Sequence, residues 1–321
     1  MPPAPAASEL FRSLGDPTRL RIVRLLRAME LTVGELAQVL GQSQPRVSRH
    51  VKILIDAGLV DRRKEGSWVF LSLGESRRVE PLFAALDGWA EIDGEDPWTL
   101  ADAARLTAVR ADRAAAAERY FASHAKDWDE IRTLHIAETE VEAAIGRALG
   151  ERPVGRLVDI GTGTGRMIEL FGRAADHALG VDRSPEMLRV ARVKLAEAGL
   201  ATAELRQGDM YSLPLPSGLA DTVIIHQVLH YAQQPAAAVA EAARLLGPGG
   251  RLLIVDFAPH EREELRIRDA HVRLGFADEA MLKYLDAAGL DGRVVEHLEG
   301  GELTVTLWAG ERREQRLKVV A

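Results

Sequence analysis

The N-terminal part of the chain spaces its apolar residues as α-helices do. Apolar residues recur every three or four positions from Leu10 to Leu26, and Gly15-Asp16-Pro17 interrupts them. Asp16 can cap the helix that follows, and Pro17 can open it. The pattern therefore predicts two consecutive helices.

Two further helices follow. Residues 30–40 predict a short helix that ends at Gly41, and Ser43 can cap the next one, which has Pro45 in its first turn. The apolar face of this last helix holds Val47, Val51, Leu54 and Ile55, whereas Gln44, Arg46, Ser48, Arg49 and Lys52 lie largely off it. We expect the polar face to be exposed.

A basic hairpin is predicted after these helices. Residues 59–73 indicate two strands around a turn at 64–67, with Arg62, Arg63 and Lys64 near its tip. Helices, a tight turn, a polar-faced helix and a hairpin are typical of a winged helix-turn-helix, whose recognition helix enters the major groove. A small helical bundle with solvated charged faces is the alternative.

The middle of the chain is predicted to be helical. Residues 91–98 form an acidic break with Gly and Pro, and residues 99–150 are rich in Ala, Arg and Glu without proline. This segment is either a connecting or dimer helix, or a cap in which Tyr120, Phe121 and Trp128 fold over a ligand.

From Gly155 onward, short apolar strands alternate with helices. Strands are predicted at 156–161, 177–182, 203–209, 221–228 and 251–257, with an antiparallel hairpin of residues 292–299 and 303–310 at the sheet edge. The alternation predicts a doubly wound α/β sheet. We therefore expect a winged helix at 1–90, a helical bridge or cap at 91–150 and an α/β domain at 151–321.

Composition and charge fit this division. The chain has 321 residues, no cysteine and a net charge of -7. Residues 1–75 hold 11 basic and 8 acidic residues (+3), and the remainder holds 30 and 40 (-10). A basic N-terminal part favours nucleic-acid contact there. No secretory signal or membrane span is evident, so we expect a cytoplasmic protein without thiolate metal sites or disulfides.

The N-terminal part resembles ArsR-type winged-helix repressors over residues 8–75. The stretches that carry the resemblance are "LGDPTRLRIVRLL", "ELAQVLGQSQPRVSRHVKILIDAGLV" and "RRKEGSWVFLSL". The resemblance implies a homodimer that reads palindromic operator DNA. The DNA-contacting residues that it implies are Ser43, Gln44, Arg46, Ser48, Arg49 and His50 on the recognition helix, with Arg62, Arg63 and Lys64 in the wing.

The metal sites of that family are missing from the sequence. The positions of its cysteine-bearing helix hold Thr32, Val33 and Gly34, and residues 76–93, after the wing, lack histidine. Metal sensing by this domain is therefore not expected, and we look for a sensor function downstream.

A glycine loop follows the first strand of the α/β domain. "DIGTGTGR" places Gly161, Gly163 and Gly165 before a helix, so backbone amides can approach a ligand. The dinucleotide pattern G-x-G-x-x-G is not met, because Arg166 takes the place of its third glycine. Asp182 and Asp209 end the next two strands, where carboxylates either accept ligand hydrogen bonds or cap helices.

This constellation resembles class I S-adenosylmethionine (SAM)-dependent methyltransferases over residues 155–257, most closely the small-molecule enzymes of quinone biosynthesis. It rests on "VDIGTGTG", "GVDRSPEML", "GDMYSLPLPSGLADTVIIHQVLHY" and "LLGPGGRLLIVDF". The resemblance implies a seven-stranded sheet that binds SAM or S-adenosylhomocysteine. The implied contacts are Asp159, Gly161, Gly163 and Gly165 at the amino-acid moiety, Asp182 at the ribose, Asp209 and Met210 at the adenine, and His226 in the pocket.

The methyl acceptor is not specified. His226-Gln227-Val228-Leu229 replaces the tetrapeptide of DNA amino-methyltransferases, and cytosine-C5 and arsenite enzymes need cysteine. An aligned acceptor can react by proximity, and a base would help. Candidate bases are His226, His230, His260 and His271, each with an alternative structural role.

Three functions are compatible with these features. The first is a DNA-binding repressor whose affinity for DNA is controlled by SAM or S-adenosylhomocysteine, without metal or membrane partners. The second is an active methyltransferase of a small molecule that also regulates its own operon. The third is an enzyme whose winged helix serves only dimerisation, which the polar face of the recognition helix disfavours.

Overall fold

The computed structural model describes residues 7–65, 68–93, 97–125, 138–299 and 301–312. The chain forms two compact units, Met1–Ala115 and Ala116–Ala321, and the boundary falls inside helix α6 (Pro97–His124). Within the described ranges, no helix is long and apolar enough to cross a membrane. Tyr120 lies in α6 without a described side chain, and Trp128 lies outside the described residues.

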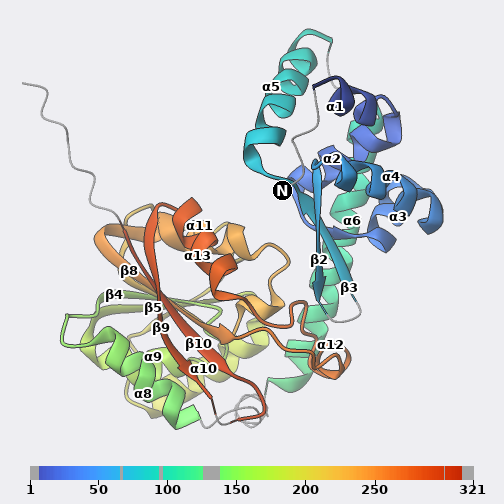
Figure 1. The fold of residues 1–321 in the computed structure, drawn as a ribbon. Coiled ribbons are helices and arrows are strands. Elements are labelled where there is room, and N and C mark those ends of the chain that lie inside the picture. Colours follow the sequence, from blue (N-terminus) through green and yellow to red (C-terminus); the bar gives the residue numbers. More distant parts are fainter. Residues whose placement is uncertain (1–6, 66–67, 94–96, 126–137, 300, 313–321) are drawn as a thin grey trace, which may run out of the picture. The chain divides into compact units, whose positions relative to one another are not determined.

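The first unit is a winged helix (Figure 1). Its elements are α1 (Ala7–Leu14), α2 (Pro17–Ala28), β1 (Leu31–Thr32), α3 (Val33–Leu40), α4 (Gln44–Asp56), β2 (Val60–Glu65), β3 (Trp68–Leu73) and α5 (Ser76–Asp93). The three strands are antiparallel in the order β1-β3-β2. The α5 helix ends and α6 (Pro97–His124) begins within the predicted acidic break of residues 91–98.

Local capping explains most of these boundaries. The Asp16 carboxylate accepts a hydrogen bond from the Thr18 amide at 2.8 Å and so starts α2, as predicted. Gly41 ends α3 in the left-handed conformation. The helix predicted over 30–40 begins only at Val33, because Thr32 and Glu35 form a capping box there. Leu31 and Thr32 instead pair with β3.

The core of the first unit includes the start of α6. Ile22, Leu36 and Val51 are buried together with Leu106 and Val109 of α6. The Arg21 guanidinium on α2 also binds both carboxylate oxygens of Asp102 on α6, at 2.6 and 2.7 Å. The first part of α6 is thus built into the winged-helix unit.

The second unit is a seven-stranded α/β sheet in the order β6-β5-β4-β7-β8-β10-β9. Its strands are β4 (Gly155–Ile160), β5 (Ala175–Asp182), β6 (Glu204–Gln207), β7 (Ala220–His226), β8 (Leu246–Phe257), β9 (Leu290–Leu298) and β10 (Val305–Arg312). The first five strands are parallel, and β10 pairs antiparallel with β8 and β9. The predicted doubly wound sheet with an antiparallel edge is confirmed.

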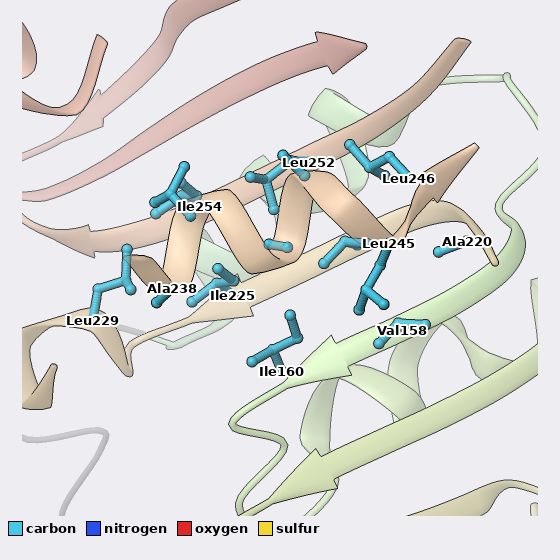
Figure 2. Close-up of a cluster of buried hydrophobic side chains, with 14 of the residues drawn as sticks. Val158, Ile160, Ala220, Ile225, Leu229, Ala238, Leu245, Leu246, Leu252 and Ile254 are labelled. Carbon is cyan, nitrogen blue, oxygen red and sulfur yellow. The ribbon is translucent and has the colours of Figure 1, made fainter. Parts of the chain in front are cut away.

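Helices cover both faces of this sheet (Figure 1). They are α8 (Glu138–Leu149), α9 (Arg166–Phe171), α10 (Pro185–Glu197), α11 (Pro235–Leu245), α12 (Glu264–Arg268) and α13 (Asp278–Ala287), with 3-10 turns η1 (Gly172–Ala174) and η2 (Leu229–Tyr231). The α11 and α13 helices cover one face, and Figure 2 shows apolar side chains such as Ile225, Ala238 and Ile254 packed between α11 and the strands. Because the first five strands are parallel, their carboxyl ends lie at one edge of the sheet, where ligands bind in such folds.

Candidate functional site

The exposed face of α4 carries the predicted DNA-contacting residues. Val47 and Val51 are buried under the helix. Ser43, Gln44, Arg46, Ser48 and Arg49 are all exposed. Ser43 occupies the N-cap position, but its hydroxyl makes no capping hydrogen bond. Within the described residues, neither Arg46 nor Arg49 has an ion pair or hydrogen bond from its side chain, so both guanidinium groups are hydrated.

His50 differs from these neighbours. Its side chain is 13% exposed, and its Nδ1 lies 3.9 Å from the Asp16 carboxylate at the start of α2. The imidazole therefore faces the body of the winged helix, whereas Arg46 and Arg49 face solvent.

The three basic residues of the wing lie on two different faces of β2. Arg62 and Lys64 of β2 are exposed. Arg63 lies between them, and successive strand residues point to opposite faces. Its guanidinium binds the Glu30 carboxylate at 2.9 Å and lies 5.6 Å from the Phe70 ring centroid. Arg63 is thus engaged within the unit, and Arg62 and Lys64 are the two outward cations.

In the second unit, the glycine loop lies between β4 and α9. Gly161, Gly163 and Gly165 all have positive φ, a conformation that favours glycine. The amides of Gly161 and Thr162 donate to the Val181 carbonyl at 2.8 and 3.0 Å, which fixes the loop to β5. A Cβ on Gly161 would lie 2.5 Å from the Val228 side chain. The loop therefore needs glycine for both conformation and space.

Two carboxylates hold this loop in place. Asp159 is buried and accepts the Thr162 hydroxyl at 2.6 Å. Asp182, at the end of β5, accepts the Gly163 and Ser184 amides at 2.8 Å each. Burial raises the pKa of Asp182, and these amides oppose that effect. The strand-end carboxylates thus organise the glycine loop before any ligand binds.

The adjacent strand end positions Asp209 and Met210. The Gly208 amide donates to the Asp182 carbonyl at 3.0 Å, which joins the ends of β5 and β6. Asp209 is exposed and accepts the Tyr211 amide at 3.1 Å, and Met210 packs against the main core. The predicted ribose and adenine residues therefore lie on two neighbouring strand ends.

The candidate histidines lie at the ends of β7 and β8. His226 ends β7 and is buried, and His230 follows in η2. His230 Nδ1 lies 2.8 Å from an Asp256 carboxylate oxygen at the end of β8. His271 is 4.3 Å from His230 between ring centroids. The structure thus brings His230 and His271 together at one edge.

Comparison with known proteins assigns the winged-helix unit. The model described as "Bacterial regulatory protein, arsR family" matches residues 16–62. A probable mercury resistance operon repressor of Streptomyces lividans is 36% identical over 98 residues, which cover 27% of this chain and 78% of that protein. The chain belongs to the arsR family of bacterial regulatory proteins.

This arsR-family chain also carries a methyltransferase domain. The model described as "Methyltransferase domain" matches residues 158–254. The uncharacterized methyltransferase YcgJ of Bacillus subtilis is 35% identical over 107 residues, which cover 33% of this chain and 42% of that protein. Its crystal structure matches with a TM-score of 0.50 at 22% identity, over 55% of this chain and 99% of that one.

These relatives are matched only in part. An uncharacterized 37.1 kDa protein in transposon TN4556 of Streptomyces fradiae is 33% identical over 129 residues, which cover 39% of this chain and 36% of that protein. The sequence matches thus span less than half the length of this relative and of YcgJ. The likeness to solved structures establishes the methyltransferase fold alone.

Sequence reasoning missed the partner of His230 in this arsR-family chain. Asp256 interrupts the apolar stretch "LLIVDF", and an acid after four apolar residues was the available signal. Its partner lies 26 positions earlier, on the segment after β7. Within the described residues, no group of three or more His, Asp or Glu side chains is arranged to hold a metal ion.

Proposed function

We propose that this protein is a transcriptional repressor whose affinity for operator DNA is controlled by SAM or S-adenosylhomocysteine. The observation that carries the proposal is that one chain holds both an exposed basic recognition helix and a glycine loop fixed by carboxylates. The recognition helix presents exposed Arg46 and Arg49, and Asp182 fixes the glycine loop by accepting the Gly163 amide. The family's cysteine positions hold Thr32, Val33 and Gly34, so the ligand signal has to come from elsewhere.

The residues at the glycine loop fit a SAM-type ligand. A Cβ on Gly161 would collide with Val228, so the loop can follow its tight path between β4 and α9 only with glycine there. A carboxylate offers about four lone-pair positions, and the backbone amides of Gly163, Ser184 and Arg183 do not occupy all of those on Asp182. The remaining positions can accept ribose hydroxyls. Met210 supplies an apolar contact for adenine, and His226 lines the same edge.

Helix α6 supports the proposed coupling between ligand binding and DNA binding. Its early residues Asp102, Leu106 and Val109 belong to the winged-helix core. Near its end, the Phe121 ring meets the Tyr231 ring edge-on, with 4.8 Å between centroids. Tyr231 lies three residues after Val228, the neighbour of Gly161. A ligand that moves this segment would therefore act on a helix that the DNA-binding unit shares.

Exposed apolar side chains support the proposed homodimer. Phe11 on α1 is 66% exposed, and Trp89 and Ile92 on α5 are 56% and 79% exposed. Large apolar residues of this kind mark protein interfaces when they gather on one surface. We expect W89E/I92E to be monomeric in analytical ultracentrifugation and to lose operator affinity. V193E, which changes an equally exposed residue on α10, should stay dimeric.

The decisive experiment measures operator binding at one fixed salt concentration. Operators are first selected from random DNA with the purified chain, and binding is then titrated without ligand, with SAM and with S-adenosylhomocysteine. Allosteric coupling is typically about 1–3 kcal/mol, or roughly 5- to 150-fold in affinity. We expect a change of about tenfold or more with one ligand, and none in G161A. Ligand binding by calorimetry without any change in DNA affinity would refute the control function.

A further inference from the structure

The carboxyl edge of β7 and β8 holds a cluster of rings that cofactor binding does not require. The His230 ring lies 4.0 Å from Tyr231, 4.9 Å from Phe257 and 4.3 Å from His271, between centroids. His260 lies 6.1 Å from Phe257. These rings come from η2, from β8 and from the segment between β8 and α13.

Asp256 fixes the orientation of His230. Its carboxylate lies 2.8 Å from His230 Nδ1 and accepts the His230 amide at 3.2 Å and the Phe257 amide at 2.8 Å. The His230 side chain is 3% exposed and that of Asp256 is fully buried. A carboxylate accepts hydrogen bonds, so the imidazole proton is on Nδ1. Nε2 of the neutral ring is therefore the atom that can accept a proton.

The cluster directly follows a residue that packs against the glycine loop. β7 pairs with β4, and Val228 approaches Gly161 closely enough to exclude a side chain there. His230 follows Val228 by two residues. The amides of Val272 and Arg273 donate to the His230 carbonyl at 3.0 and 2.9 Å, so the His271 segment is fastened to η2.

Backbone strain occurs at the same edge. Among the described residues, the non-glycine positions with positive φ are Gln227 (φ 50°) and Ala270 (φ 57°). They directly follow His226 and precede His271. Strain of this kind costs about 1–3 kcal/mol per residue and is concentrated at functional sites.

From this geometry we propose that His230, oriented by Asp256, is the proton acceptor of a methyl-acceptor site for a planar aromatic hydroxyl compound. The inference adds an activity to the proposed regulator and rests on its proposed SAM binding. Surrounding rings favour a planar aromatic acceptor through stacked and edge contacts. Imidazole, with a pKa of about 6.5, matches a phenol of about 10 much better than an alkyl alcohol.

The reaction would transfer one methyl group. The acceptor oxygen forms a bond to the methyl carbon, and the bond between that carbon and the sulfonium sulfur breaks. The electron pair of the broken bond stays on sulfur, which leaves S-adenosylhomocysteine. The phenolic proton passes to His230 Nε2 and then to solvent. Asp256 is a positioning residue that holds the Nδ1 proton and balances the imidazolium charge once Nε2 has accepted the phenolic proton.

The test uses the full chain saturated with S-adenosylhomocysteine and a panel of nitrophenols, nitrocatechols and nitronaphthols. Phenolate absorbance reports ionisation of the bound probe without any methyl transfer. We expect at least one probe to bind with its ionisation midpoint shifted down by about one pH unit or more. H230Q should lose this shift, and H177Q, which changes an exposed side chain on β5, should keep it. Absence of any bound probe with a shifted midpoint in the unmodified chain overturns the proposal, whether or not the variants fold.

Methyl transfer provides the second readout. With SAM, we expect transfer to the bound probe to fall roughly 100-fold or more in H230Q, the usual contribution of a general base. Transfer should rise with pH in the unmodified chain and lose that rise in H230Q. Among the described residues, Asp256, Tyr231 and His271 contact His230, and His260 contacts His271. A pH profile that is lost in H271Q or H260Q but kept in H230Q would overturn the assignment of His230 as the base. D256N should alter the pH profile, and D256E should restore part of it.

These results separate the two proposals. If calorimetry detects no SAM binding, the proposed ligand control fails. If SAM binds and no probe ionises or is methylated, only the acceptor site fails. A fall in melting temperature in H230Q with an unchanged probe shift would identify the His230–Asp256 pair as a structural brace and reject its role as a base.

Discussion

The two units prepare their candidate sites in opposite ways. On the recognition helix, Arg46 and Arg49 are exposed and unpaired among the described residues, so binding DNA displaces mainly water and counterions. In the sheet unit, Asp182 is bonded to backbone amides and the loop has no space for a side chain at Gly161. We therefore expect substitutions on the recognition helix to weaken DNA binding without lowering stability. Substitutions at the glycine loop should lower both ligand binding and stability.

The largest effect is expected for G161A. Alanine would have to adopt φ +73° and place its Cβ 2.5 Å from Val228. The left-handed backbone costs about 1–2 kcal/mol and overpacking about 1–3 kcal/mol. We expect slower-exchanging amides of β4 and β5 to lose about 2–5 kcal/mol of protection in hydrogen exchange, and SAM binding to disappear in calorimetry.

G289A is the matched control for this variant. Gly289 has a similar φ of +77°, but a Cβ there meets nothing within 4 Å. It should therefore show the backbone cost without the steric cost and keep SAM binding. Equal losses in the two variants would mean that close packing at Gly161 is unimportant, and the contrast between the units would weaken.

The next effect is expected for R46A/R49A. Each guanidinium that contacts a base edge contributes about 1–3 kcal/mol to DNA binding. Exposed side chains usually change stability by less than about 0.5 kcal/mol. We expect operator affinity, measured by fluorescence anisotropy, to fall at least tenfold with unchanged hydrogen-exchange protection. R192A removes an exposed arginine from α10 and should change neither.

The salt dependence of operator binding by the same variants distinguishes contacts with phosphates from contacts with bases. Loss of a phosphate contact reduces the slope of log affinity against log salt by about 1, whereas loss of a base contact mainly relaxes sequence preference. Unaltered affinity in R46A/R49A would remove the recognition-helix face from the DNA interface.

Asp182 gives a prediction about pH. Because its folded-state pKa is raised above the ordinary 3.8, the folded chain binds this proton more tightly than the unfolded chain. The stabilisation from protonation is complete below the unfolded pKa and is lost as pH rises through the folded pKa. Relative to D182N, which does not titrate, the ligand-free chain should gain stability as pH falls through that window.

SAM affinity should change in the opposite direction. The ionised carboxylate is the better acceptor for ribose hydroxyls, so affinity measured by calorimetry should fall over the same pH range. D182N should bind SAM weakly at all pH values. Parallel changes in stability and affinity would show that Asp182 only braces the loop.

The sequence predicted those parts of both sites that depend on local pattern. Glycine spacing and strand-ending carboxylates identified the loop and Asp182, because both features are read within a few residues. The pairing of His230 with Asp256 depends on two strands that become neighbours only in the folded sheet. The start of α3 was misplaced because Thr32 caps that helix and also pairs with Phe70 in β3.

The smallest effects on stability and DNA binding are expected for substitutions in the wing. There, neighbouring basic residues point to opposite faces of β2. The partly exposed Arg63 side chain pairs with Glu30 at 2.9 Å and lies over the buried Phe70 ring, and each contact contributes about 0.5–1 kcal/mol. R63A should lower protection of β2 and β3 in hydrogen exchange by about that amount and leave operator affinity within about twofold.

R62A should show the reverse. Its exposed guanidinium has no partner within the described residues, so stability should be unchanged and the salt slope of operator binding reduced by about 1. If R63A weakened DNA binding more than R62A, the Glu30 pair would have to open on the operator. The wing would then resemble the sheet unit, because one side chain would serve both stability and binding.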